Sequence, residues 1–531
     1  MSDSRHMAGS VYRSPVLAVG VLLVSSVIGL VAEDSWPMWR RDSKGGTVPG
    51  EPTLQDPQIT QASRLWISED DLPPGRRGGG DDGRDRDGLA NMERPLTGGY
   101  GSPVAAAGMV FQYHYRPSGT VYDGPRARGL GMSQEELRAQ QPEMTGNIVR
   151  GHERWLVSAT DRITAIDMET GKTVWRTDLT DEGLNFGFFG KGGGGLTPAY
   201  HDGMIMSYAS SAQVFGLDAA SGEIRWTYNL VPRYEQHRAY RKEALEGNHF
   251  AARFNRGMLT GLVAADGLVI VNDQRWHRVQ LQSGTTNHYD TFNSYVALDV
   301  KTGEPRWEAP EVGDTGSNPK IVNIAGKNYV LAVSRLRLTL LDLASGRQIW
   351  QSDVGHDSPT CAFNLGVSDQ YVVMAARQQG VDGRYLKGYR IDLEGLHELW
   401  SWGRIREFRS NALIVNDIGY MTVNEQLRAF DPQTGTVLAE VPVGDIRPAG
   451  GNPFVVYYGG WLFLRARGYG EDGLDGLYVM NADPEKMAGT KRFYQADLAQ
   501  PYYCLIIPAF ANGTIFFRTD LSNKMEAYRL R

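Results

Sequence analysis

The sequence predicts an all-β fold, an eight-bladed β-propeller made of four-stranded antiparallel blades. Three observations support this prediction. A hairpin pattern that carries one Trp recurs along the chain, and runs with alternating apolar residues flank each copy. The 63 glycines and 10% aromatic residues suit many short strands and tight turns. The two ends of the chain each look like half of one more copy, so we expect their strands to pair and close the ring.

The repeated unit is a hairpin with an Asp-x-x-Ser/Thr-Gly turn. The Asp carboxylate can accept hydrogen bonds from N–H groups of the turn, and Gly supplies the residue with positive φ. In each full copy the Trp lies eight residues after the Asp. The full copies run from Asp167 to Trp175, Asp218 to Trp226, Asp299 to Trp307 and Asp342 to Trp350.

Weaker copies continue the series after residue 390. Asp392 reaches Trp400 with Gly395 in a shifted position, Asp431 is followed by Gly435 and Ala439, and Asn481 is followed by Phe493 and Tyr494. Residues 525–530 resemble a strand without its partner, and residues 64–67 carry a Trp without a preceding Asp turn. Pairing these two segments gives the eighth blade.

The repeated tryptophans are expected to pack between blades, because a large flat ring with one polar N–H suits such a junction. This structural role is favoured over a role in binding a cofactor. The tryptophans concerned are Trp66, Trp175, Trp226, Trp307, Trp350 and Trp400.

The N-terminus has the layout of an export signal. Arg5 and Arg13 precede an apolar run at residues 16–32, and polar residues follow. Cleavage after this run or retention of residues 1–32 as a membrane anchor both remain open. Either outcome predicts an exported protein of the periplasm or cell envelope that meets a membrane only through an uncleaved N-terminal segment.

The remaining chain divides into an extension and the propeller. Residues 33–63 form an N-terminal extension that we expect to cross the propeller, and residues 64–531 form the propeller itself. Within it, residues 73–94 are polar and of low complexity, which predicts a flexible linker.

Four insertions interrupt the repeats, at residues 116–153, 231–256, 273–293 and 468–476. The strands of a blade alternate in direction, so their connections alternate between two faces. All four insertions fall on connections opposite the Asp-Gly turns. We therefore expect one insertion-bearing face, on which a rigid scaffold presents functional loops, and protein partners that bind there.

The charges do not indicate a nucleic-acid-binding protein. The chain has 55 Lys and Arg against 61 Asp and Glu, a formal net charge of −6, and the two signs are interspersed. No basic stripe is present in the sequence, so a mixed, solvated surface is expected.

The repeated Ala/Leu-x-Asp-x-x-Ser/Thr-Gly-x-x-x-Trp pattern resembles the PQQ-like (quinoprotein-type) propeller repeat. Two groups with this repeat imply different functions. Resemblance to the propeller protein of the outer-membrane barrel assembly machine implies protein binding without a cofactor. Resemblance to quinoprotein dehydrogenases implies pyrroloquinoline quinone (PQQ) with calcium. The vicinal Cys pair of the alcohol dehydrogenases is absent, since the only cysteines are Cys361 and Cys504, and no calcium ligand can be matched.

The densest polar group lies in the third insertion, where Asp273, Arg275, His277 and His288 are candidates for a site at the mouth of the channel. An Asp near a His can perform acid–base chemistry or bind a metal. However, the spacing from His277 to His288 fits no compact metal motif, so no catalytic or metal-binding residue is assigned. The sequence thus favours an exported binding or scaffold protein, and the alternative is a divergent PQQ-dependent dehydrogenase that oxidises an alcohol or sugar.

Overall fold

The computed structural model describes residues 34–38, 40–47, 50–72, 101–121, 157–185, 197–209, 213–230, 261–278, 289–310, 312, 318–333, 337–354, 365–377, 384–404, 412–423, 425–443, 454–466, 476–496, 506–519 and 523–530. The chain divides into two units, Met1–Ala32 and Glu33–Arg531. Among the described residues, no helix has the length and apolar character needed to cross a membrane.

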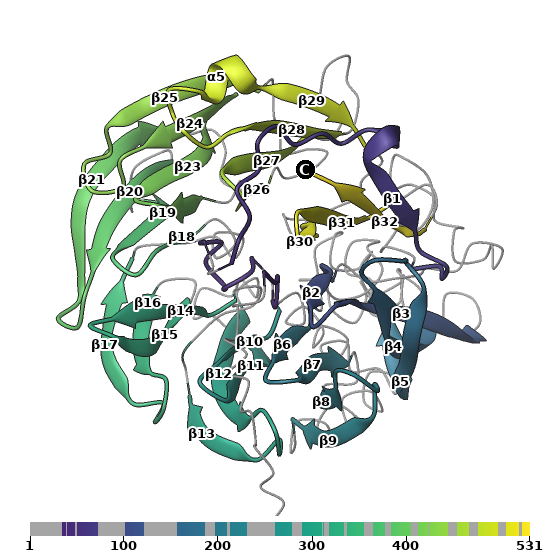
Figure 1. The fold of residues 1–531 in the computed structure, drawn as a ribbon. Helices are drawn as coiled ribbons and strands as arrows, with labels where there is room; N and C mark the ends of the chain where they lie inside the picture. The colour runs from purple at the N-terminus through teal and green to yellow at the C-terminus, as the bar shows by residue number, and fades with distance from the viewer. Residues whose placement is uncertain are drawn as a thin grey trace, which may run out of the picture. The chain divides into compact units, whose positions relative to one another are not determined.

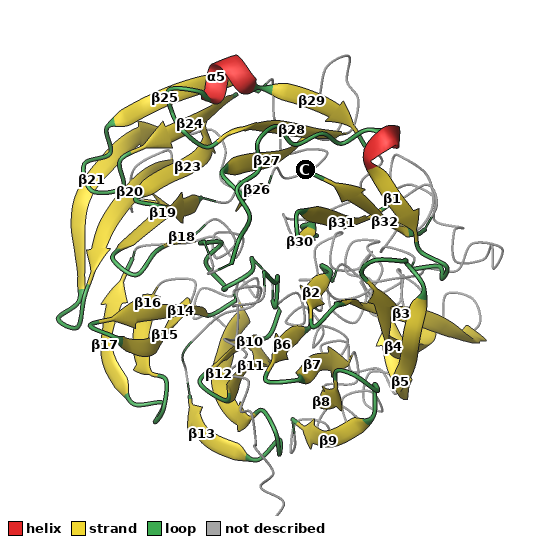
Figure 2. Ribbon diagram, in the orientation of Figure 1, coloured by secondary structure: helices red, strands yellow, loops and turns green. Residues whose placement is uncertain are grey.

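The predicted eight-bladed propeller is confirmed. Eight four-stranded antiparallel sheets are arranged in a ring (Figures 1 and 2), and in blades 1 to 7 the strands follow chain order from the axis outward. The strands of blades 1 to 4 are, in order: β2 (Val104–Ala106), β3 (Met109–Val121), β4 (Val157–Asp167), β5 (Thr173–Asn185); β6 (Ala199–His201), β7 (Met204–Ala209), β8 (Gln213–Asp218), β9 (Ile224–Asn229); β10 (Val263–Ala265), β11 (Leu268–Arg278), β12 (Tyr289–Asp299), β13 (Pro305–Ala309); β14 (Lys320–Ile324), β15 (Lys327–Val333), β16 (Arg337–Asp342), β17 (Gln348–Asp353).

Blades 5 to 8 have the same arrangement, and blade 8 takes its outer strand from the N-terminal part of the chain. Their strands are: β18 (Gly366–Val367), β19 (Tyr371–Arg377), β20 (Arg384–Ile391), β21 (Leu396–Arg404); β22 (Leu413–Val415), β23 (Ile418–Val423), β24 (Gln426–Phe430), β25 (Val437–Pro442); β26 (Val455–Tyr458), β27 (Trp461–Ala466), β28 (Gly476–Asn481), β29 (Arg492–Gln495); β30 (Ala509–Ala511), β31 (Thr514–Arg518), β32 (Met525–Arg529), β1 (Arg64–Ile67). The described residues also include the short helices η1 (Gln61–Ser63) and α5 (Met487–Thr490).

Pairing of the two chain ends closes the ring, as predicted. Strand β1 runs antiparallel to β32, with Arg64 opposite Tyr528 and Ile67 opposite Glu526. The closure gives blade 8 four strands, as in every other blade. No blade of the ring therefore lacks its outer strand.

A repeated junction joins one blade to the next. The indole N–H of Trp226, on the outer strand β9, donates to the carbonyl of Val300 at 2.9 Å, in the turn of blade 3. The turn glycine Gly303 lies on the same ring, where a Cβ would approach Trp226 Cδ2 and Cε3 at 2.6 Å. The corresponding indole-to-carbonyl distances are 2.8 Å for Trp66 to Met168, 3.0 Å for Trp175 to Ala219, 2.8 Å for Trp307 to Leu343, 2.8 Å for Trp350 to Asp392 and 2.8 Å for Trp400 to Pro432.

The turns behind these junctions have the geometry that their sequence demands. In blade 3, Asp299 Oδ1 accepts from the backbone N–H groups of Lys301 at 2.9 Å and Thr302 at 3.0 Å. Gly303 follows with φ of 71°. The Arg306 guanidinium holds the pKa of the Asp299 carboxyl below its usual value. The Asp therefore organises the turn, and Gly lets the turn contact the preceding blade.

The inner strands supply the core. The middle strands of blade 2 are buried along their length, for example at every residue of β7. In contrast, four of the six residues of the outer strand β9 are exposed, and only Trp226 is buried. This difference follows from position, because an inner strand lies between the two neighbouring blades and an outer strand lies at the rim of the ring.

Candidate functional site

The face opposite the Asp-Gly turns carries the connections between second and third strands. In blade 3 this connection is shorter than the sequence suggested, because β11 extends to Arg278 and β12 already begins at Tyr289. Residues 273–278 and 289–293 therefore belong to a strand pair rather than to an irregular insertion. The aromatic and β-branched residues of this stretch favour strand structure over a loop.

The predicted polar group falls largely on this extended hairpin. Asp273, Arg275 and His277 occupy alternate positions of β11. In the backbone register, Asp273 is opposite Ser294 and His277 is opposite Asp290. His288 lies outside the described residues. A role for these residues in binding or chemistry stays a prediction.

The tips of the insertions also lie outside the described residues. The structure does describe the strands that precede and follow the insertions. In blade 1, β3 and β4 pair from Met109 with Asp167 to Val121 with Val157, so their connection leaves at the end of the hairpin remote from the Asp167 turn. The corresponding connections of the other blades leave from the same face, because every blade has the same order of antiparallel strands.

The opposite end of the axis is occupied by the chain itself. Residues 34–54, here called the axial segment, run across the middle of the ring before the chain reaches β1 (Figure 1). Trp36 and Arg41 are completely buried there. The Trp36 carbonyl accepts from Ala105 N at 2.9 Å, and the Pro37 carbonyl accepts from Tyr200 N at 2.7 Å. The segment is thus bonded to the innermost strands of blades 1 and 2.

A buried ion cluster fixes the shape of the axial segment. The Arg41 guanidinium donates to Asp34 at 2.7 Å and to Glu51 at 2.5 Å. The two carboxylates also accept from the ring: Asp34 from the Tyr458 hydroxyl and, at 2.7 Å, from Asn512 N, and Glu51 from Gly459 N. Burial raises the pKa of the Tyr458 hydroxyl, and its hydrogen bond to Asp34 adds to this rise.

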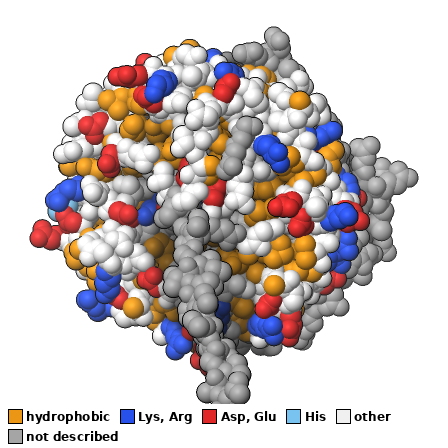
Figure 3. Space-filling model, in the orientation of Figure 1, with side chains coloured by type: hydrophobic (Ala, Val, Ile, Leu, Met, Phe, Trp, Pro, Cys, Tyr) orange, Lys and Arg blue, Asp and Glu red, His pale blue; other side chains and the backbone are white. Residues whose placement is uncertain are grey.

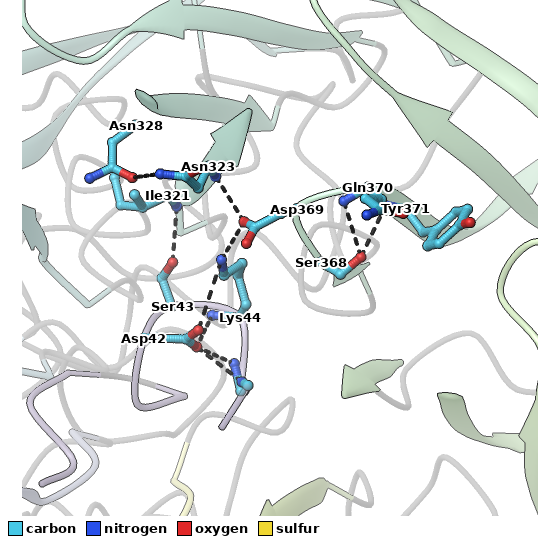
Figure 4. A network of polar contacts seen from close by, with 12 residues as sticks. Asp42, Ser43, Lys44, Ile321, Asn323, Asn328, Ser368, Asp369, Gln370 and Tyr371 are labelled. Carbon is cyan, nitrogen blue, oxygen red and sulfur yellow. Dashed lines mark hydrogen bonds and ion pairs between the residues drawn. The ribbon is translucent and has the colours of Figure 1, made fainter. Parts of the chain in front are cut away.

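A second polar network joins the axial segment to blades 4 and 5 (Figure 4). Lys44 Nζ contacts Asp369 Oδ1 at 2.6 Å, and the same oxygen accepts from Asn323 N at 2.8 Å. Ser43 Oγ accepts from Ile321 N at 3.0 Å. Beside it, the Ser43 carbonyl accepts from Lys320 Nζ at 2.7 Å.

Two features of this region are unusual. Lys320 is almost fully buried, and this burial places the pKa of its amine well below the ordinary value, with the nearby Arg40 charge acting in the same direction. Arg40, Arg41 and Ser43 have φ values of 54°, 62° and 72°. Non-glycine residues adopt this left-handed conformation at a cost, so the surrounding contacts must hold it in place.

The described axial residues do not fit a PQQ–calcium site. At the level of Trp36, Arg41 and Lys320 the axis holds buried side chains, so a quinone at this level would have to displace the axial segment. Within the described ranges, no group of three or more His, Cys, Asp or Glu side chains is arranged to hold a metal ion. We therefore derive no reaction through this cofactor.

The axial network was not among the candidate residues chosen from the sequence. The cluster of Trp, Pro and Arg at residues 36–41 was its only local signal. Its partners Lys320, Asp369, Tyr458 and Asn512 lie hundreds of residues away in the chain, and nothing in their own sequence surroundings distinguishes them from ordinary strand and turn residues.

Comparisons with known proteins find similarity to the outer membrane protein assembly factor BamB at the level of sequence and of fold. A curated relative, the outer membrane protein assembly factor BamB of Moranella endobia (strain PCIT), is 20% identical over 219 residues, which cover 41% of this chain and 46% of the relative. The chain thus matches less than half of that relative's length.

Solved structures with similar folds include BamB from Moraxella catarrhalis, with 15% identity, a TM-score of 0.41 and coverage of 70% of this chain and 91% of that chain. The quinohemoprotein alcohol dehydrogenase from Comamonas testosteroni has 14% identity and a TM-score of 0.44, and covers 83% of this chain and 77% of that chain. Neither similarity supports an argument about function.

The family assignment comes from the sequence profile described as "Outer membrane protein assembly factor BamB". It matches residues 126–290 and 277–437, which together make up more than half of the chain. With the confirmed propeller fold and its repeated hairpins, this match shows that the chain belongs to the BamB family of PQQ-like β-propeller proteins.

Proposed function

We propose that this protein is an exported β-propeller that acts as a binding or scaffold protein, and that its protein partners bind the insertion-bearing face. The observation that carries the proposal is the asymmetry of the ring. One end of the axis is filled by the chain's own axial segment, and the connections that hold the long insertions leave from the other end. Loops on a rigid scaffold are the usual carriers of recognition.

Membership of the BamB family supports a role in a protein assembly, because the family is described as an assembly factor of outer membrane proteins. We propose accordingly that the protein works in the periplasm or at the cell envelope, and that residues 1–32 provide the export signal or an anchor. Binding of nucleic acid is not part of the proposal. Figure 3 shows both signs of charge interspersed over the visible face, without a large basic area.

A dehydrogenase function is not favoured. That alternative needs PQQ and calcium on the axis, where the described residues are a buried Trp, two buried arginines and a buried lysine. Reconstitution with PQQ and calcium, followed by a dye-linked alcohol or sugar oxidation assay, tests this directly. Turnover above that of the untreated protein would contradict the proposed function.

The binding proposal is tested by exchanging insertions for short Gly-Ser connections. Two variants are made, one without residues 122–153, the part of the first insertion that lies beyond β3, and one without residues 231–256. Each is expressed with a photo-crosslinking residue at a fixed position of the turn-bearing face and at one position of each remaining insertion. We expect crosslinked protein partners from the insertion positions, and their loss when the neighbouring insertions are removed. The matched control is Glu169→Lys, an exposed change in a turn of the opposite face, which should leave the crosslinks unchanged.

Unchanged melting temperatures are required of all these variants, so that loss of a partner reports binding and not unfolding. If the crosslinks persist after each insertion is removed, or if they disappear with Glu169→Lys, the insertion-bearing face is not the binding surface.

A further inference from the structure

Residues 34–72, here called the N-terminal arm, contact the rest of the propeller as a peptide ligand contacts a receptor. Much of the contact uses the arm's backbone. Trp36 N donates to the Ala105 carbonyl at 2.6 Å, and the Trp36 carbonyl accepts from Ala105 N at 2.9 Å. Leu54 N donates to the Gly459 carbonyl at 2.9 Å. Backbone pairing of this kind is a recurring mode of peptide recognition.

The arm also has a shape of its own. Its buried cation, Arg41, is neutralised by two carboxylates of the same arm, Asp34 and Glu51. The remaining acceptor positions of these carboxylates receive donors from blades 7 and 8. The ion cluster therefore pre-organises the arm, and the ring supplies a matching set of donors. Pre-organisation of a ligand reduces the entropy lost on binding.

A second point of attachment lies at the rim of the ring. Strand β1 pairs with β32, and the Trp66 indole donates to the Met168 carbonyl of blade 1 at 2.8 Å. Asp70 forms an ion pair with Arg176 of the same blade. The arm is thus held on the axis and at the rim by contacts that do not depend on the chain connection between Leu72 and blade 1.

Both ends of that connection are fixed by a single side chain of blade 8. Arg518, which is 1% exposed, donates from Nε at 3.2 Å and Nη2 at 3.1 Å to the Leu72 carbonyl. Its Nη1 donates to the Gly101 carbonyl at 3.1 Å, and Gln112 Nε2 donates to the same carbonyl at 3.0 Å. Residues 73–100, which lie outside the described residues, therefore begin and end at one point that the folded ring holds together.

We infer that the propeller contains a peptide-binding site, formed by the turn-side end of its axis and the edge of β32, and that the N-terminal arm is its ligand in cis. The ligand class is an extended peptide with a buried Arg flanked by two carboxylates, followed by a β-strand. The arm stays bound, and the ring stays folded, when the covalent connection between Leu72 and Gly101 is cut.

The test uses the full chain with a protease recognition sequence placed between residues 80 and 90. After cleavage, we expect the two fragments to elute together in size-exclusion chromatography and to separate only in denaturant. A labelled synthetic peptide of residues 34–72 should replace the cleaved arm slowly, and the replacement gives the dissociation rate. Immediate separation of the fragments, or collapse of the ring on cleavage, would overturn the inference.

The axial contribution is measured with Arg41→Met in the cleavable chain. Removal of the guanidinium leaves two buried carboxylates without their partner, which should weaken retention of the arm on the order of a hundredfold or more. The matched control is Arg225→Met, which removes an exposed ion pair with Asp218 on a turn outside the arm, and it should leave retention unchanged. If Arg41→Met prevents folding before cleavage, Glu51→Gln is the milder variant. Equal retention in the axial variant and the control would assign the binding to β1 alone and refute the axial site.

Discussion

The contact between a turn glycine and the tryptophan of the preceding blade can be tested with one matched pair of substitutions. Gly303 and Gly267 have nearly the same φ, 71° and 75°, in the left-handed region. A Cβ at Gly303 would lie 2.6 Å from two atoms of the Trp226 ring, whereas a Cβ at Gly267 would meet nothing within 4 Å. Gly267→Ala therefore measures the conformational cost, and Gly303→Ala measures that cost together with the steric contact.

The expected magnitudes follow from these two terms. An alanine in the left-handed region costs about 1–2 kcal/mol. Displacement of a packed ring adds an overpacking term of about 1–3 kcal/mol. The free energy of unfolding should therefore fall by about 1–2 kcal/mol in Gly267→Ala and by about 2–5 kcal/mol in Gly303→Ala.

Urea unfolding of both variants, followed by tryptophan fluorescence and by circular dichroism, measures the difference. A second pair, made in a Trp226→Leu background, isolates the contact because the excess cost of Gly303→Ala should then largely disappear. Equal destabilisation by the two glycine substitutions in the wild-type background would refute the idea that the Gly–Trp contact is tight.

Three further predictions concern closure, titration and the cysteines. Deletion of residues 60–70 should lower the melting temperature of the whole propeller, because β1 completes blade 8, and an unchanged calorimetric curve would contradict this. Burial lowers the pKa of the Lys320 amine, so below pH 10.5 the folded state binds fewer protons than the unfolded state. The wild-type chain should therefore gain stability relative to Lys320→Met as pH rises toward that value. A constant difference between the urea midpoints of the two proteins over this pH range would exclude the effect. Cys361 and Cys504 lie outside the described residues. The sequence assigns them to blades 5 and 8, which should hold their Cα atoms farther apart than the roughly 7 Å that a disulfide allows, so we predict two free thiols. Alkylation without reductant followed by mass spectrometry should label both, whereas a mass lower by 2 Da without label would show a disulfide.

The blade count could be predicted from the sequence because the information is local. Each turn keeps its Asp, its Gly and its distance to the Trp within nine residues, and a turn of fixed geometry sets the register of the hairpin around it. The ring closure was also predictable, since residues 64–67 and 525–530 are each an incomplete copy of the same pattern.

The axial network could not be predicted in the same way. The Tyr458 hydroxyl and the Asp34 carboxylate are 424 positions apart, and neither residue belongs to a motif. The extended hairpin of blade 3 was also missed, because the polar Asp273, Arg275 and His277 indicated a loop. The aromatic and β-branched residues between and opposite them favour a strand, and that preference prevails in the structure.

The indole junction is absent from one part of the ring. Ala439 stands on β25 where other blades have their Trp, and β29 carries Phe493 and Tyr494. There the arm makes contacts of its own: the Trp461 indole donates to the Leu54 carbonyl at 2.9 Å, and the Tyr494 hydroxyl donates to the Pro57 carbonyl at 3.2 Å. The arm thus binds blade 7 where the repeated indole junction is missing, although more than 400 positions separate each pair of residues in the chain. Because blades 1 to 6 lie between the arm and blade 7 in the chain, the arm can make these contacts only after blade 7 has been synthesised.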